Sequence, residues 1–245
     1  MRFPTTQWQI VEHLKDGSDE DRRRALGDII NLYGAPLMAF ALRHSHGTRT
    51  TEDCEDSVND FFVRCIEGGI LAHADKARGR FRSFLVTSFR YFLLNERRSK
   101  QTQRRHPSGG FVSLATLREE MGAALEPRSN ETPEDAFHRV LRRAQFDRVL
   151  AEFDSRCRAA GNDVMFRMFL LRDVRPAREG VPPPAYAGLA GTLGLASENA
   201  ANKVALAARE EFRQLLFDAV GRDCTTSEEA RAECEQILAT ALTQG

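Results

Sequence analysis

The chain has 245 residues, of which 42% are hydrophobic and 29% are charged, a composition that is typical of a globular protein and excludes a disordered one. The 35 basic and 35 acidic residues give a formal net charge of zero, so any binding to nucleic acid must come from local patches of charge. The length allows two modest domains or one large one.

Helical periodicity dominates the chain, because apolar residues recur at spacings of three and four and almost nowhere at two. In the first half this pattern predicts four helices. Thr5 or Thr6 can cap the first helix, the second is expected to break near Gly34–Pro36, and Gly68 and Gly69 are expected to end the third. The predicted ranges are 5–15, 19–46, 51–68 and 80–104.

The composition changes at 106–132, where Pro, Gly, Ser and Asn replace the periodic apolar positions. We interpret this stretch as a linker with a short helix at 114–122. Thr132 as the cap and Pro133 at the first helical position predict the start of the next helix.

The second half of the chain continues with helices and one loop, at 172–184. Gly161 and Asn162 are expected to stop the helix that starts at Pro133, and Ser197 is expected to cap a later one. The last helix looks like an appendage to the others. The predicted helical ranges are 133–160, 163–171, 185–193, 198–220 and 227–242.

These ranges predict an all-α protein with two helical domains joined by a flexible linker. The predicted limits are 1–105 for the first domain, 106–132 for the linker, 133–222 for the second domain and 223–245 for a C-terminal helical extension.

Charge changes sign abruptly inside the first domain. Residues 51–75 hold seven acids and one base, Arg64, whereas residues 76–105 hold ten bases and one acid, Glu96. A solvated surface does not need such segregation, but a protein that binds a basic partner with one helix and nucleic acid with the next would need it. The alternative for the acidic half is an ordinary solvated helix.

The basic half interleaves arginines with aromatic residues. Arginine binds phosphates bidentately and stacks on bases, and exposed aromatic side chains near such a patch could stack unpaired bases. The phenylalanines have helical spacing, so we expect most of them to lie in the core. They are Phe81, Phe84, Phe89 and Phe92.

Residues 186–213 have the pattern of a helix-turn-helix. Ala190 is small where the two helices must approach closely, and Gly194 allows the left-handed backbone of the turn. Polar side chains at the start of the second helix could contact base edges and phosphates in a major groove, although the helix is only weakly basic. An ordinary helical hairpin is the alternative. Leu189, Leu193, Leu195 and Val204 are expected to pack the two helices together.

Signs of an enzyme or of a metal site are weak. The five cysteines include no C-x-x-C pair and are odd in number, which argues against a disulfide framework and against zinc. The chain has no Gly-rich phosphate loop, G-x-S-x-G or H-E-x-x-H motif. We therefore expect no catalytic residue, no metal and no cofactor.

The N-terminal segment lacks the apolar core of a signal peptide, and no apolar run is expected to reach transmembrane length. The sequence thus predicts a cytoplasmic protein with no membrane contact.

The acidic helix, the basic aromatic helix and the helix-turn-helix, in this order, resemble a bacterial RNA polymerase sigma factor of the extracytoplasmic-function class. The resemblance covers roughly 5–105 and 133–216, and it is strongest in EDCEDSVNDFFVRCIE (52–67) and GRFRSFLVTSFRYFLLNERRSKQTQRR (79–105). The N-terminal FPTTQWQIVEHLKDG is similar to a subgroup of that class found in planctomycetes.

The resemblance implies a region that binds the clamp of core RNA polymerase. The family's clamp-binding helix reads Asp-x-x-Gln-Glu-x-Phe, and the counterpart here begins at Asp56, with each of the two central polar residues one carbon shorter. The implied polymerase-binding residues are Asp56, Asn59, Asp60, Phe61, Phe62 and Arg64.

The resemblance also implies two contacts with promoter DNA. The basic helix would hold the melted strand of the minus-10 element through Arg80, Arg82, Arg90, Asn95, Arg97, Arg98, Lys100, Arg104 and Arg105. The helix that starts after Ser197 would read the duplex of the minus-35 element through Ser197, Glu198, Asn199, Asn202, Lys203 and Arg209.

The expected function is therefore a transcription initiation factor whose partners are core RNA polymerase, promoter DNA and an anti-sigma regulator. Two alternatives stay open: a stand-alone helix-turn-helix regulator that binds duplex DNA unaided, and a sigma-like decoy that binds an anti-sigma regulator.

Overall fold

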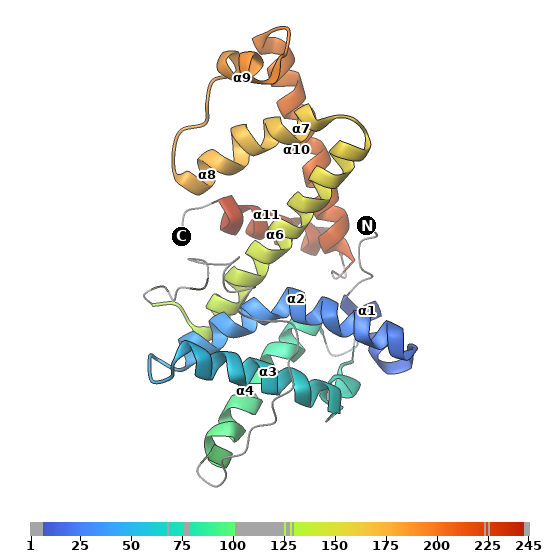
Figure 1. Ribbon diagram of the computed structural model, residues 1–245, viewed down its shortest axis with the longest axis vertical. Coiled ribbons are helices and arrows are strands. Elements are labelled where there is room, and N and C mark those ends of the chain that lie inside the picture. Colours follow the sequence, from blue (N-terminus) through green and yellow to red (C-terminus); the bar gives the residue numbers. More distant parts are fainter. Residues whose placement is uncertain are drawn as a thin grey trace. The chain divides into compact units, whose positions relative to one another are not determined.

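In the computed structural model, every regular element that is described is helical, so the fold is all-α (Figure 1). The described residues are 7–67, 69–75, 79–100, 125, 128, 130–222, 224 and 226–242. They divide into two compact units, and the division lies between Leu141 and Arg142. We call these the N-terminal unit and the C-terminal unit.

The N-terminal unit contains α1 (Gln7–Asp16), α2 (Asp19–His44), α3 (Thr51–Glu67), the short 3-10 helix η1 (Ile70–His73) and α4 (Phe81–Lys100). Helix α2 begins with a capping box, in which the Asp21 amide donates to the Ser18 hydroxyl while the Ser18 amide donates to the Asp21 carboxylate. The predicted first-helix caps, Thr5 and Thr6, lie outside the described residues.

Helix α2 does not break at its proline. It runs through Pro36, and Gly34, Ala35 and Pro36 are all buried. A proline inside a helix removes one backbone hydrogen bond, but thirteen buried residues hold this helix in the core. The predicted break near Gly34–Pro36 is therefore wrong, because tertiary packing outweighs the local penalty.

The middle of α2 is also apolar enough to be compared with a membrane span. By length and composition alone it passes that test, and 72% of the apolar window is buried inside the protein. The expectation that no run reaches transmembrane length is thus wrong for this helix, although buried core helices pass the same test.

Helix α6 (Pro133–Ala159) contributes to both units. Its start follows the prediction, since the Asp135 amide donates to the Thr132 hydroxyl and the Thr132 amide donates to the Asp135 carboxylate. Its first turns bury Phe137, which stacks on Tyr33 of α2 at 6.3 Å between ring centroids. The predicted domain limits stay a prediction, and the short helix predicted at 114–122 lies outside the described residues.

The C-terminal unit contains the rest of α6 and then α7 (Asp163–Phe169), the π-helical turn η4 (Leu170–Val174), α8 (Arg175–Glu179), α9 (Tyr186–Leu193), α10 (Glu198–Gly221) and α11 (Ser227–Leu242). The loop predicted at 172–184 is partly wrong, because helical structure continues to Glu179. The π turn carries the chain from α7 into α8.

Helix α11 is part of the core of this unit and is not an appendage. Ile237 and Ala241 are fully buried in one cluster with Phe146 of α6 and Phe212 of α10. Because its apolar face completes this cluster, the C-terminal helix is expected to stabilise the unit.

Candidate nucleic-acid and protein interfaces

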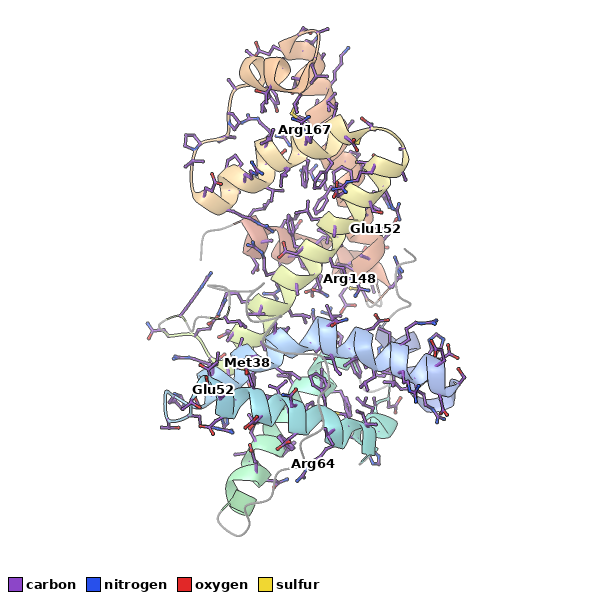
Figure 2. The ribbon with its side chains drawn as sticks, in the orientation of Figure 1. Met38, Glu52, Arg64, Arg148, Glu152 and Arg167 are labelled. Carbon is purple, nitrogen blue, oxygen red and sulfur yellow. The ribbon has the colours of Figure 1, made fainter. Side chains whose placement is uncertain are left out.

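Helix α3 presents an acidic face and buries an aromatic one. Glu52, Asp53 and Asp56 are exposed along its first two turns, and Figure 2 labels Glu52 near the start and Arg64 near the end of the helix. Thr50 precedes the helix and caps it, since its hydroxyl accepts a hydrogen bond from the Asp53 amide at 3.1 Å.

The structure divides the predicted polymerase-binding residues into two groups. Asp56 and Arg64 are exposed, and Asn59 and Asp60 are half-buried. Phe61 and Phe62 are only 0% and 1% exposed, so neither can form a contact surface in this structure. Their assignment as contact residues is corrected: they belong to the core beneath the acidic face.

A buried polar network ties the start of α3 to α4. The Ser57 hydroxyl donates to the Glu96 carboxylate at 2.8 Å, and Arg49 reaches the same carboxylate at 3.3 Å. Arg49 also donates to the carbonyl of Asp53 at 2.7 Å. Glu96, the one acid of the basic segment, is thus turned inward, so the described part of α4 presents no exposed carboxylate to solvent.

Helix α4 separates its aromatic residues by face. Phe81, Phe89 and Phe92 are buried, whereas Tyr91 is 63% exposed. Phe89 packs edge-to-face on Phe61 of α3 with 5.0 Å between ring centroids. The expectation that most of these phenylalanines lie in the core is confirmed.

The exposed side of α4 carries groups suited to single-stranded nucleic acid. Tyr91, Leu94 and Asn95 are exposed on its C-terminal half. Arg80 and Arg82 are half-buried at its start. The side chains of Arg97, Arg98 and Lys100, and the whole of Arg104 and Arg105, lie outside the description.

Arg90 is exposed but it already has a partner. Its guanidinium group contacts the carboxylate of Glu134 in the first turn of α6. To contact nucleic acid, Arg90 would have to exchange this carboxylate for a phosphate. Its predicted contact with the minus-10 element therefore requires that the ion pair with Glu134 breaks first.

Helices α9 and α10 are joined by a tight turn. Gly194 has a φ of +67°, and the Leu195 amide donates to the Ala190 carbonyl at 2.8 Å while the Gly194 amide donates to the Gly191 carbonyl. This is the Schellman arrangement that ends a helix with a left-handed residue. Glycine is the residue that adopts this conformation without strain.

A small apolar cluster holds the two helices together. Leu189, Ala190 and Leu193 of α9 pack with Ala201 and Ala205 of α10, joined by half-buried Leu195 and Val204. The expected packing of Leu189, Leu193, Leu195 and Val204 is confirmed.

The start of α10 presents the predicted polar groups. Ser197 caps the helix, with its hydroxyl accepting from the Ala200 amide at 3.2 Å. Glu198, Asn199 and Lys203 are exposed and Asn202 is half-buried. Leu206, which sequence reasoning missed, is 55% exposed and follows Asn202 and Lys203 at helical spacing on the same face.

Arg209 is held inside the unit and is not available as a free contact. Its guanidinium group binds Asp173 of η4, and Tyr186 of α9 lies against the same cluster with Arg172 over its ring at 4.6 Å. Burial alone would raise the pKa of the Tyr186 phenol, but hydrogen bonds from Arg172 and Arg209 outweigh burial and lower that pKa. Arg209 thus forms an ion pair within the unit, and a contact with DNA, which stays a prediction, would have to exchange Asp173 for a phosphate.

Among the described residues there is no group of three or more His, Cys, Asp or Glu side chains that could hold a metal ion. All five cysteines are free thiols. Burial raises the pKa of the Cys65 thiol to about 12. Burial is also the largest cause that raises the pKa of the Cys157 thiol to about 11. Thiols of this kind are unreactive at neutral pH.

Comparison with models of protein families, with curated proteins and with solved structures found no match to this chain.

Proposed function

We propose that the protein is a sigma-type transcription initiation factor, which binds core RNA polymerase, directs it to promoters and helps to melt the minus-10 region. The observation that carries the proposal is the opposite charge of two neighbouring helices in one unit. Helix α3 exposes Glu52, Asp53 and Asp56, whereas α4 exposes Tyr91 and Arg90, the latter paired with Glu134, and turns its one acid inward.

The two faces suit different partners. An acidic face repels DNA and favours a basic protein surface, which we assign to the polymerase. An arginine-rich face with an exposed aromatic side chain suits an unpaired strand, because every base can stack on a ring and the phosphates are attracted to the cations.

Helices α9 and α10 are the proposed helix-turn-helix, with α10 in the major groove of the minus-35 element. The supporting observations are the Gly194 turn and the exposed Asn199 and Lys203 at the start of α10. Each contact is modest, and joining two weak modules raises their combined affinity through effective concentration. Catalysis would belong to the polymerase.

The test is co-elution of the purified protein with core RNA polymerase of its own host on size exclusion. Wild-type protein should co-elute, and Asp56→Arg should weaken the complex. Glu12→Arg, which reverses another exposed acid of the same unit, is the matched control and should bind as wild type. If the wild-type protein and core polymerase elute separately, the proposed function is wrong.

A second candidate is a stand-alone regulator that binds duplex DNA, supported by the α9–α10 hairpin alone. It would bind duplex without polymerase and would not depend on Asp56. A third, the decoy for an anti-sigma regulator, is favoured by Arg209, since its pairing with Asp173 leaves α10 weakly basic. Such a protein would bind its regulator and support no transcription.

A further inference from the structure

The connection between α8 and α9 is a short extended segment that none of the candidate interfaces includes. Residues 181–185 read Val-Pro-Pro-Pro-Ala, belong to no helix and are all exposed. Val181 at its start is 48% exposed, which places it among the large apolar side chains that face solvent. Figure 1 shows this connection as an open trace between α8 and α9. We call residues 181–185 the proline segment.

The backbone of the proline segment has the polyproline II conformation. A proline ring fixes φ at about −65°, and a residue that precedes a proline is restricted to the β and polyproline II regions. The second restriction applies to Val181, Pro182 and Pro183, because each of them precedes a proline. Ala185 has a φ of −63° and a ψ of 147°, close to the ideal values of about −75° and about +145°. The segment therefore has this form before any partner binds.

Both ends of the proline segment are fixed to neighbouring helices, and its middle is free to bind. At its start the Val181 amide donates to the Pro176 carbonyl of α8 at 3.0 Å, and at its end the Ala185 carbonyl accepts from the Leu189 amide of α9 at 3.2 Å. Among the described residues, no donor reaches the carbonyls of residues 181–184. Since the prolines have no amide N–H, the segment presents hydrogen-bond acceptors and apolar rings to solvent.

The proline segment and helix α9 carry no charge. Residues 180–197 contain no Asp, Glu, Lys or Arg, in a chain of which 29% is charged. Nucleic acids and anionic membranes attract proteins through cations, so neither of them suits this part of the surface. A groove in another protein suits it, because such a groove can supply both apolar contacts and hydrogen-bond donors.

We propose that the proline segment is a docking site for a protein partner whose groove is lined with aromatic side chains. The rings of such a groove pack against prolines in the polyproline II form, and a donor such as a tryptophan N–H binds the free carbonyls. Because the segment is already extended, binding orders little additional backbone. This inference stands apart from the proposed function, since it rests on the segment alone. A rigid spacer between α8 and α9 is the alternative that the test must exclude.

Helix α9 leaves room for such a partner beside the segment. Ala187, Gly188 and Gly191 are exposed on this helix, and no atom of another element lies within 4 Å of a Cβ placed on either glycine. A partner bound to the proline segment can therefore extend onto α9 without meeting a side chain at these positions. It would then lie beside the helix that packs on the start of α10 through Ala201 and Ala205.

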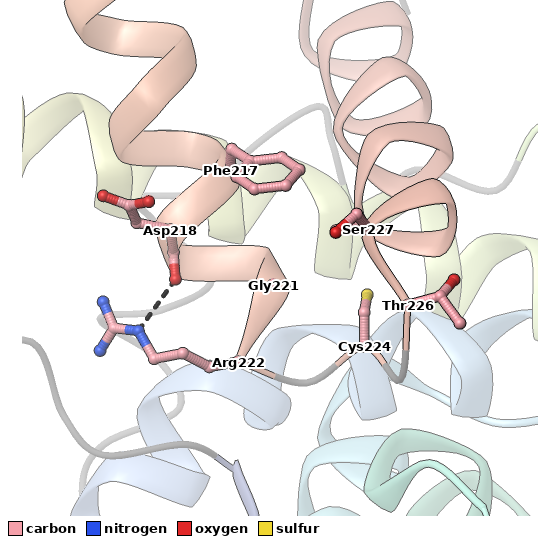
Figure 3. A pocket seen from close by; sticks show the side chains of 8 residues that line it. Phe217, Asp218, Gly221, Arg222, Cys224, Thr226 and Ser227 are labelled. Carbon is pink, nitrogen blue, oxygen red and sulfur yellow. Dashed lines mark hydrogen bonds between the residues drawn. The ribbon is translucent and has the colours of Figure 1, made fainter.

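The opposite end of α10 supplies a control surface in the same unit. A cavity of about 400 Å³ lies where α10 ends and α11 begins, and Figure 3 shows Ser227 of α11 among the residues that line it. Helix α10 has 24 residues and is therefore about 35 Å long, which separates Ser227 from the end on which α9 packs. Ser227 is exposed, so its substitution should leave the proline segment unchanged.

The first measurement uses isolated WW, SH3 and EVH1 domains as probes, because their aromatic grooves bind polyproline II segments. Adding the full-length protein should shift the NMR resonances of the groove residues of at least one probe. Pro183→Ala removes one ring and its fixed φ, so it should weaken this binding by about fivefold or more. Ser227→Ala should bind as wild type. If no probe binds the wild-type protein, or if Pro183→Ala binds equally well, the proposal is wrong.

The second measurement looks for the partner in the host. A photo-activated cross-linker replaces Val181 in one form of the full-length protein and Ser227 in a control form. We expect a host protein joined at Val181 and absent at Ser227. Once purified, that protein should lose affinity for Pro183→Ala and should compete with the probe domain. Probe binding without a host protein captured at Val181 would show a rigid spacer only, and a captured protein that binds Pro183→Ala like wild type would equally overturn the proposal.

Discussion

The guanidinium group of Arg209 closes on the carboxylate of Asp173, with Nη2 at 2.7 Å and Nε at 2.9 Å from the same oxygen, Oδ1. The bond joins α10 to the π turn, and the hydrogen bond to Asp173 is the main cause that raises the pKa of Arg209 above its ordinary value. A side chain that sequence reasoning assigned to DNA thus stabilises the unit that would carry the DNA-binding helices.

Arg209→Ala should therefore reduce the stability of the C-terminal unit, whatever its effect on DNA binding. Both side chains are partly exposed, at 28% and 19%, so we expect a coupling energy of about 1 kcal/mol between Arg209 and Asp173. A double-mutant cycle with Asp173→Ala in urea would measure it. Lys203→Ala, on the exposed side of α10, should leave the urea midpoint unchanged; additive losses in the cycle would disprove the coupling.

Phe62→Ala should unfold the N-terminal unit rather than affect docking directly. Removing a fully buried phenylalanine costs about 3–5 kcal/mol, so the urea midpoint should fall sharply. Asp56→Arg, at an exposed position of the same helix, should leave the midpoint within error. Circular dichroism in urea on both variants checks this, and equal stability of Phe62→Ala and wild type would contradict the burial of that ring.

Tyr91→Ala should weaken binding to single-stranded DNA without affecting folding. Its ring is 63% exposed, and base stacking on an exposed ring contributes about 1–3 kcal/mol. Fluorescence anisotropy of the polymerase complex with a labelled non-template strand would measure the loss. Thr87→Ala, an exposed residue of the same helix, is the control. An unchanged affinity for Tyr91→Ala would remove this residue from the interface.

Glu131 should make the N-terminal unit sensitive to acid. Its carboxylate receives two hydrogen bonds from Arg139, at 2.7 and 3.0 Å, in a site where both side chains are about a tenth exposed. Burial works to raise the pKa of Glu131, but the hydrogen bonds and positive charges of Arg139 and Arg128 together outweigh burial and lower that pKa below its ordinary value.

The sign of the pH effect follows from this lowered pKa. The stabilisation is fully present above the ordinary pKa near 4.5 and is lost as the pH falls through the folded pKa. Glu131→Gln should cost about 2 kcal/mol at neutral pH and should flatten the loss of stability below pH 4.5, as measured by thermal unfolding across pH. If Glu131→Gln loses stability below pH 4.5 as steeply as the wild-type protein, another group controls the acid sensitivity.

Ile237→Ala should destabilise the C-terminal unit by about 2–5 kcal/mol, because the side chain is fully buried in α11. Leu206→Ala removes a comparable side chain from an exposed position and should change stability by less than about 0.5 kcal/mol. Urea unfolding of the pair compares them directly. If Ile237→Ala unfolds at the wild-type midpoint, α11 is not part of this core.

Sequence periodicity predicted the helical class and most helix limits, because apolar spacing and capping residues such as Ser197 and Thr132 act locally. It failed where distant packing decides. The burial of Pro36 in α2 and the joining of α11 to the core depend on neighbours that a linear pattern does not contain. In the candidate interfaces, the sequence showed which types of residue are present. It did not show which of the charged side chains are already paired with other side chains of the protein.

Arg209 and Glu96 show why the sequence alone does not reveal such pairing. Each partner of Arg209 comes from another helix, and Glu96 is turned inward by Ser57 and Arg49. A charge counted along the chain is available to a ligand only when no neighbour of opposite sign reaches it first. Leu206 is the opposite case. It is an exposed apolar side chain, and the periodic pattern of the sequence does not distinguish it from the leucines of the core.

The π turn at Leu170–Val174 sets the rotational phase of the chain that follows it. Phe169 and Val174 are both buried, although five residues of regular α-helix would place their side chains about 140° apart around the axis. The wider turn contains one extra residue and brings both onto one side. Deleting one residue from this turn would place Val174 four positions after Phe169 in an ordinary helix, about 40° away around the axis, so both side chains would still face the core without the wider turn.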